Sequence, residues 1–235
     1  MSQSPSLHTT LKDRAEAGRR LVEPLLKYAH RPDVIVLALP RGGVPVAYQV
    51  VKALDVRLDL MLVRKLGVPS NPEFAMGAIA SGGIQIRNEE ALRTHPISAA
   101  AFETVVERET RELQRREQLY RGARPPLQLK DQVVILVDDG LATGASMMAA
   151  IRAVRMQAPA RIVVAVPVAP LETVETLSFE VDEVICPLMP EWMMSIGYWY
   201  LHFPQTSDEE VNDLLQRAWL REAHGDSSSQ EPLDD

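Results

Sequence analysis

Residues 132–146 read Gln-Val-Val-Ile-Leu-Val-Asp-Asp-Gly-Leu-Ala-Thr-Gly-Ala-Ser, and this stretch decides the fold. Its five apolar residues, 133–137, are mostly β-branched and lead directly into two acids, a pattern typical of a strand covered on both faces. From Ser146 onward the apolar side chains recur at helical spacing, so a glycine-containing turn joins this strand to a helix. The stretch therefore predicts the strand, turn and helix of an α/β protein with a parallel sheet.

The turn before this helix combines two kinds of donor. Backbone N–H groups at a helix start lack internal partners and lie at the positive end of the helix dipole, and Thr143 and Ser146 add hydroxyl groups suited to a phosphate monoester. Asp138 and Asp139 do not favour that anion, but they can accept hydrogen bonds from a ribose diol or hold a hydrated divalent cation. A ligand with a ribose diol and a 5′-phosphate would satisfy both halves. The alternative is an ordinary turn with an acid pair facing solvent.

The same residues carry a family resemblance. Residues 137–146 resemble the phosphoribosyl pyrophosphate (PRPP) signature of type I phosphoribosyltransferases, in which an apolar strand, two acids and two variable residues precede a small-Thr-Gly-x-Ser/Thr loop. The resemblance implies that Asp138 and Asp139 contact the ribose hydroxyls and hold the Mg²⁺ that binds with PRPP. It also implies PRPP contacts along the rest of the signature, at Gly140, Ala142, Thr143, Gly144, Ala145 and Ser146.

Ala142 is a departure from one branch of the resembled family. Purine-type members usually carry an Asp at this position, where it is placed to assist proton transfer on the base, whereas pyrimidine-type members often lack it. Ala142 therefore disfavours a purine acceptor without weakening PRPP binding. The resemblance implies transfer of the phosphoribosyl group to a small-molecule, nucleobase-like acceptor. A PRPP-sensing regulator without transferase activity is the alternative, since this fold also serves regulators, and a nucleotide-binding scaffold is a weaker one.

A second strand-to-helix junction follows the apolar residues 34–39. It reads Pro40-Arg41-Gly42-Gly43, in which paired glycines let the backbone approach a ligand closely and the arginine offers a fork for phosphate oxygens. Alone, a Gly-Gly turn between a strand and a helix is commonplace. In the resembled family this is the pyrophosphate loop, and many members hold a non-proline cis peptide there. The resemblance thus places Arg41, Gly42 and Gly43 against the pyrophosphate of PRPP.

Residues 58–63 predict a third strand, which ends at Arg64 and Lys65. Residues 66–74 contain two prolines and show neither helical nor strand periodicity, which predicts an irregular loop. The resemblance implies a flexible loop here that closes over the active site and excludes water. It also makes Lys65 a candidate for binding pyrophosphate, against the alternative of a solvated strand-end cation. The candidate catalytic residues are then Arg41, Lys65, Asp138 and Asp139.

The remaining segments continue the alternation of strands and helices. Residues 75–86 predict a hairpin, and residues 97–121 predict a long helix. For the charged face of this helix, exposure to solvent is favoured over contact with a partner protein. Further strands are expected at residues 161–168 and 181–186, with a helix at residues 171–177 between them. The order predicts a doubly wound parallel sheet of the type I phosphoribosyltransferase kind with a C-terminal hood segment.

The hood segment, about residues 187–206, concentrates aromatic side chains in a chain that is only 5% aromatic. Such rings can stack on a flat base, and type I transferases place a variable, acceptor-selecting hood near this end of the chain. The candidate acceptor-binding residues are Trp192, Ile196 and Tyr198. The alternative is that the aromatic side chains only cover the edge of the sheet.

Length and composition describe one ordinary globular domain. The chain has 235 residues, of which 46% are hydrophobic and 24% charged, and we expect a single domain at residues 11–223 between mobile tails at residues 1–10 and 224–235, the latter acidic. The net charge of −7 argues against nucleic acid, and no apolar run is long enough for a membrane span. With a single cysteine and no visible signal peptide, we expect a cytoplasmic protein. The sequence does not decide between a monomer and a homodimer.

Overall fold

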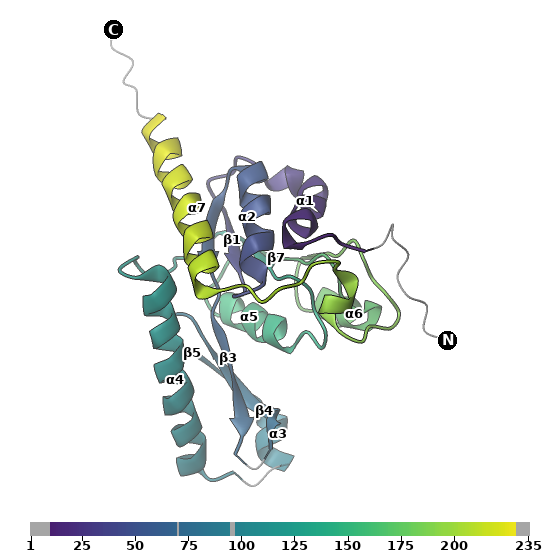
Figure 1. Cartoon of the computed structure of the whole chain (residues 1–235). Coiled ribbons are helices and arrows are strands. Elements are labelled where there is room, and N and C mark those ends of the chain that lie inside the picture. Colours follow the sequence, from purple (N-terminus) through teal and green to yellow (C-terminus); the bar gives the residue numbers. More distant parts are fainter. Residues whose placement is uncertain (1–9, 70, 95–96, 229–235) are drawn as a thin grey trace.

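The computed structural model describes residues 10–69, 71–94 and 97–228 (Figure 1). A parallel sheet of five strands in the order β2-β1-β6-β7-β8 forms its centre. The strands are β1 (Val34–Ala38), β2 (Arg57–Leu60), β6 (Val133–Val137), β7 (Arg161–Ala165) and β8 (Glu183–Ile185). The predicted α/β class with a doubly wound parallel sheet is confirmed.

The apolar run of β6 is explained by a core on each face of the sheet. Val133, Ile135 and Val137 pack in one core, with side chains from α1 (Arg14–Leu25), α2 (Gly43–Leu54) and α7 (Asp208–Ser228). Val134 and Leu136 point into the other core, which includes side chains from α5 (Ala145–Arg155) and α6 (Leu171–Ser178). Because successive strand residues point to opposite faces, a strand between two helical layers must be apolar throughout.

A second sheet with antiparallel pairing projects from this body. It contains β3 (Val63–Val68), β4 (Asn71–Ala80) and β5 (Ile84–Arg87), and is followed by α3 (Glu89–Thr94) and α4 (Ala99–Arg121). Figure 1 shows α4 running beside these strands toward the start of α7. The predicted hairpin is confirmed as β4 and β5, and the predicted long helix as α4. None of the helices within the described residues is long and apolar enough to cross a membrane.

Two predictions in the segment between α2 and α3 are wrong. The single strand expected at residues 58–63 is divided, because β2 ends at Leu60 in the parallel sheet and β3 begins at Val63 in the antiparallel sheet. The irregular loop expected at residues 66–74 lies largely in β3 and β4. Their ladder contains register shifts on both sides of Gly67, so the paired strands lack the regular alternation by which sequence patterns identify a strand.

Helix α4 is joined to the rest of the molecule by two ion pairs with little exposure. Arg121 at its C-terminal end donates to the Asp59 carboxylate on β2, Nε to Oδ1 at 2.8 Å, and these side chains are only 10% and 6% exposed. Arg64 on β3 donates two hydrogen bonds to Glu109, which is buried on the inner face of α4. A buried charge costs several kcal/mol unless a partner compensates it, so these pairs fix how α4 is seated.

We expect Asp59→Ala to lower the free energy of unfolding by about 3 kcal/mol, because it leaves the Arg121 guanidinium buried without its carboxylate. Urea denaturation would measure this loss. Asp213→Ala is the matched control, since Asp213 and Arg217 form an exposed pair one helical turn apart, whose loss should cost less than about 0.5 kcal/mol. Equal losses in the two variants would show that the Asp59 pair is no more than a surface contact.

Candidate active site

The loops that follow β1 and β6 are in direct contact. The two strands pair in parallel, so their carboxyl ends meet at the same edge of the sheet, where ligands of open α/β sheets bind. A Cβ placed on Gly42 would lie 1.9 Å from Oδ2 of Asp139, and one placed on Gly43 would lie 2.7 Å from the carbonyl oxygen of Val137. Only glycine fits at these positions. The peptide bond between Pro40 and Arg41 is cis, as the resemblance implied for this loop.

Asp139 is held by residues from both ends of the chain. Nε of Arg14, the first residue of α1, donates to its Oδ2 at 2.8 Å, and both side chains are 11% exposed. The same guanidinium stacks 3.9 Å from the ring centroid of Phe203 and donates through Nη1 to the carbonyl oxygen of Pro204. The hydroxyl of Tyr200 donates to the backbone oxygen of Asp139 at 2.6 Å. The second acid of the pair is therefore both oriented and electrostatically compensated.

Arg14 and Tyr200 did not emerge from the sequence. Arg14 lies 125 positions from Asp139 along the chain, and Tyr200 lies 61 positions from it. No local spacing links such residues, and an arginine in the first turn of a helix is otherwise an ordinary surface residue. The aromatic composition of the hood was the one signal that pointed toward Tyr200.

Asp138 is half-buried, whereas the neighbouring Asp139 is buried. Its Oδ1 accepts a hydrogen bond from the Asp139 N–H at 2.8 Å, and it lines a small pocket of about 100 Å³ together with Pro40, Arg64 and Ser146. Burial raises the pKa of the Asp138 carboxyl well above its usual range, and the neighbouring charge of Asp139 raises it further. The folded protein therefore disfavours the ionised form of Asp138.

The turn at the start of α5 is formed by Thr143 and Gly144. Gly144 has φ 70°, a left-handed conformation that glycine adopts without steric cost, and the helix begins at the next residue. Thr143, Ala145 and Ser146 are exposed, so their donors are accessible from solvent. Ala142 is also exposed, and its carbonyl oxygen accepts a hydrogen bond from Thr173 on α6 at 2.9 Å.

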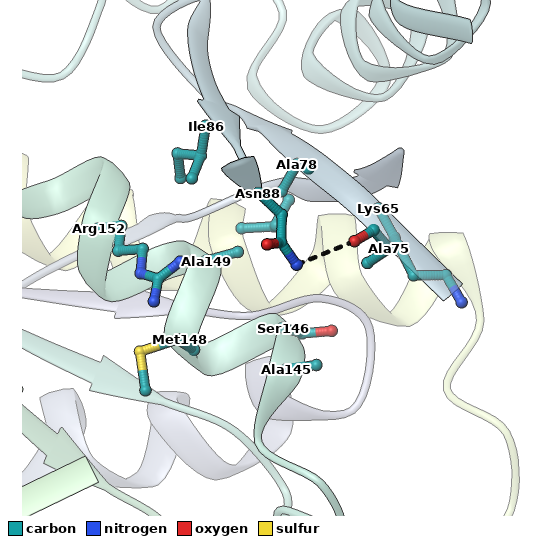
Figure 2. Close-up of a pocket in the computed structure, with 12 residues that line it drawn as sticks. Lys65, Ala75, Ala78, Ile86, Asn88, Ala145, Ser146, Met148, Ala149 and Arg152 are labelled. Carbon is teal, nitrogen blue, oxygen red and sulfur yellow. Dashed lines mark hydrogen bonds between the residues drawn. The ribbon is translucent and has the colours of Figure 1, made fainter. Parts of the chain in front are cut away.

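The two candidate cations lie at different places around this turn. Nη1 of Arg41 is 3.5 Å from Oδ1 of Asp208, the first residue of α7, and the Tyr120 hydroxyl from α4 donates to the same oxygen. Lys65 lies within β3 and lines a separate pocket of about 210 Å³ between the antiparallel sheet and α5, which it shares with Ser146. Figure 2 shows Lys65 at one end of this pocket and Arg152 at the other. The structure thus places Arg41 and the acid pair on neighbouring loops. Lys65 lies in the separate pocket that Ser146 also lines.

The hood contacts the signature through one of its three candidate residues. Ile196 begins the 3₁₀-helix Ile196–Trp199, and its Cγ2 would lie 2.7 Å from a Cβ placed on the buried Gly140. Trp192 and Tyr198 are instead 66% and 41% exposed. Ile196 therefore packs against the residue that follows the acid pair, whereas the side chains of Trp192 and Tyr198 are exposed.

Comparison with known proteins agrees with this geometry. A family model described as the phosphoribosyl transferase domain matches residues 9–198. The chain belongs to this family. Two Mycobacterium tuberculosis proteins, from strains CDC 1551 and H37Rv, carry the name "Putative phosphoribosyl transferase" and are each 42% identical over 206 residues. The match covers 88% of this chain and 46% of theirs, so the chain spans about half the length of these curated relatives.

A solved structure resembles this chain over most of the length of both chains. The crystal structure of TT1426 from Thermus thermophilus is 42% identical, with a TM-score of 0.78. The match covers 88% of this chain and 98% of that chain. The arrangement of strands and helices is therefore shared with that protein along nearly its whole chain.

The acid pair suits a metal ion that arrives with its other ligands. Among the described residues, no three His, Cys, Asp or Glu side chains cluster closely enough to hold a metal ion by themselves. Mg²⁺ is commonly bound by one or two carboxylates together with substrate phosphates and several waters. Asp138 and Asp139 supply that number of carboxylates and fit such an ion.

We expect Asp138→Asn to raise the melting temperature at pH 7, because it removes a charge that the fold disfavours and keeps an oxygen for the Asp139 N–H. A raised folded-state pKa means that this cost is fully present above that pKa and disappears below the unfolded value, about 4. Thermal melts from pH 4 to 8 would therefore show the advantage of Asn shrinking in acid.

The exposed Asp33 provides a control of opposite sign. A hydrogen bond from Arg31 lowers the pKa of the Asp33 carboxyl, so Asp33→Asn should slightly lower stability at pH 7, and this loss should vanish in acid. A lower melting temperature for Asp138→Asn than for the parent protein at pH 7 would contradict our account of the acid pair.

Proposed function

We propose that this domain binds Mg·PRPP and transfers its phosphoribosyl group to a small, nucleobase-like acceptor, with release of pyrophosphate. The observation that carries the proposal is the contact between Gly42 and Asp139, which joins the candidate pyrophosphate loop and the candidate ribose site into one cleft edge. Membership of the phosphoribosyl transferase family supports it. Neither loop alone would distinguish this ligand from an ordinary nucleotide.

In this proposal the two acids recognise the ribose. Arg14 donates to Oδ2 of Asp139, and the Asp139 N–H donates to Oδ1 of Asp138; among the described residues, these contacts leave the other oxygen of each carboxylate for a ligand. Two such oxygens match the two vicinal hydroxyls of PRPP. Mg²⁺ would be held by Asp138 and Asp139 together with oxygens of PRPP, and it would neutralise charge on the pyrophosphate.

The remaining signature residues would bind the phosphate at the other end of the ligand. Thr143 and Ser146 offer hydroxyl groups, and the N–H groups at the start of α5 add the positive end of a helix dipole. Gly140, Ala142, Gly144 and Ala145 would contact PRPP through their backbone. The site therefore separates acceptors for hydroxyls from donors for phosphate along the length of one ligand.

Catalysis would come from positioning and from stabilising the leaving group. Breaking the bond from C1 to pyrophosphate develops positive charge on the ribose and negative charge on the departing oxygens. Arg41, Lys65 and the backbone N–H of Gly42 would stabilise the negative charge, and the fixed ribose would bring C1 to the acceptor.

The acceptor would bind beneath the hood. Ile196 already lies against Gly140, and Trp192 and Tyr198 would supply stacking surface if the hood closes on a flat base. The exposed methyl group of Ala142 offers no proton acceptor at the position where purine-type relatives carry an acid. This observation also favours the second candidate function, a PRPP-binding regulator that performs no transfer.

The double variant Asp138→Asn, Asp139→Asn should fold and lose Mg·PRPP binding, because the amides keep the shape of the pair but remove its charge. Isothermal titration calorimetry with Mg·PRPP would decide this. The control is Asp33→Asn with Asp213→Asn, which removes the same charge from two exposed positions. Unchanged PRPP affinity in the Asp138 and Asp139 variant would refute the ribose role of the pair.

The residue at position 142 separates the enzyme from the regulator. We expect the parent protein to turn over hypoxanthine and guanine weakly or not at all, because general-base help of about 10²–10⁴-fold is missing there. Ala142→Asp should raise any purine activity present. Pyrophosphate release would be followed across purines, pyrimidines and small amines. Fast turnover of hypoxanthine by the parent would defeat this argument, and PRPP binding with no acceptor consumed would identify a regulator.

A further inference from the structure

Much of the charged face of α4 is exposed, but one of its arginines lines a pocket. The small pocket that contains Asp138 and Ser146 is also lined by Arg116, which lies on α4 near its C-terminal end. The other lining residues come from the segment around Pro40, from the connection between β2 and β3, and from the start of β3, which includes Arg64. A helix that follows the antiparallel sheet in sequence thus places a guanidinium beside both candidate ligand loops.

The position of Arg116 is set by neighbouring contacts of α4. Two turns earlier Glu109 is buried and holds Arg64, and one turn later the Tyr120 hydroxyl donates to Asp208, which also pairs with Arg41. These contacts join α4 to β3 on one side and to the candidate pyrophosphate loop on the other. Arg116 is therefore carried on a part of α4 that is held on both sides, at Glu109 and at Tyr120, and its side chain is 33% exposed.

Arg116 also carries uncompensated charge. Its Nε donates to Oε1 of Glu112 at 2.8 Å, and Arg115 donates to both oxygens of the same carboxylate. These hydrogen bonds lower the pKa of Glu112 to about 2, so the carboxylate stays ionised. One negative charge is thus shared by two arginines, which leaves a net positive charge. Within the described part of the chain, the Nη groups of Arg116 make no hydrogen bond.

We infer that Arg116 binds the pyrophosphate group of PRPP and, after transfer, the released pyrophosphate. The inference rests on the proposed function and adds a substrate-binding residue that lies in neither ligand loop. The Nη groups can donate two parallel hydrogen bonds to phosphate oxygens, which a lysine cannot reproduce. Arg64 donates through both Nε and Nη2 to Glu109, which Arg108 also contacts, and so positions α4, whereas the Nη groups of Arg116 are available to the ligand.

Arg115 provides a matched control for this role. It is adjacent in sequence, has the same side chain and shares the same carboxylate, but it is 60% exposed and does not line the pocket. Loss of either arginine changes the net charge and the Glu112 contacts in a similar way. A difference between Arg115→Ala and Arg116→Ala in ligand binding can therefore be attributed to the pocket.

Calorimetry would compare three probes in the presence of Mg²⁺: PRPP, inorganic pyrophosphate and ribose 5-phosphate. We expect Arg116→Ala to weaken PRPP and pyrophosphate binding by about tenfold to a hundredfold, the usual range for a hydrogen bond to a charged group, and to leave ribose 5-phosphate unaffected. Arg116→Lys should recover part of the loss. Arg115→Ala should bind all three probes as the parent does.

Several outcomes would overturn the inference. They are unchanged pyrophosphate affinity in Arg116→Ala, an equal loss for all three probes, or the same loss in Arg115→Ala. If Arg116→Ala does not fold, Arg116→Gln keeps the side-chain bulk and is judged by the same comparison. A parent that binds pyrophosphate but not PRPP would refute the proposed function and leave Arg116 as a pyrophosphate ligand, whereas a parent that binds neither would refute both.

Discussion

The contact between the loops after β1 and β6 is the constraint on which the rest of the site depends. Parallel pairing of these strands brings both loops to one edge of the sheet, and the missing side chains of Gly42 and Gly43 allow their backbones to touch. Any larger residue would push the Asp139 carboxylate away from Arg14. The glycines therefore serve packing between two loops as well as the approach of a ligand.

Carboxylates and guanidinium groups lie on different sides of this contact. Arg14 compensates Asp139 from the side of α1, whereas burial and the neighbouring charge of Asp139 raise the pKa of Asp138. Functional sites often retain such a cost in stability because ligand binding requires the unsatisfied group. Arg41 and Arg116 approach from the side of α7 and α4, where a phosphate-rich ligand would extend.

The antiparallel sheet and α4 extend away from the parallel sheet (Figure 1). The C-terminal end of α4 nevertheless contacts the parallel sheet, through the pair between Arg121 and Asp59. The ion pairs of Arg64 and Arg121, each with a buried carboxylate, hold α4 in place. Removing one partner of such a pair costs more free energy than the intact pair contributes to stability. The practical result is orientation. Helix α4 thereby reaches the edge of the parallel sheet where the loops after β1 and β6 meet.

The sequence by itself determined the parallel-sheet fold, the acid pair, the turn before α5 and the loop at Arg41, because buried strands, helix starts and signature spacing are all local patterns. Only the tertiary structure decided that Arg14, Tyr200 and Arg116 join these residues, since they lie far away in the chain or on a helix whose spacing indicates only a solvated face. It also decided that residues 66–68 and 71–74 lie in paired strands. Their interrupted ladder depends on a partner strand, which periodicity within one segment cannot reveal.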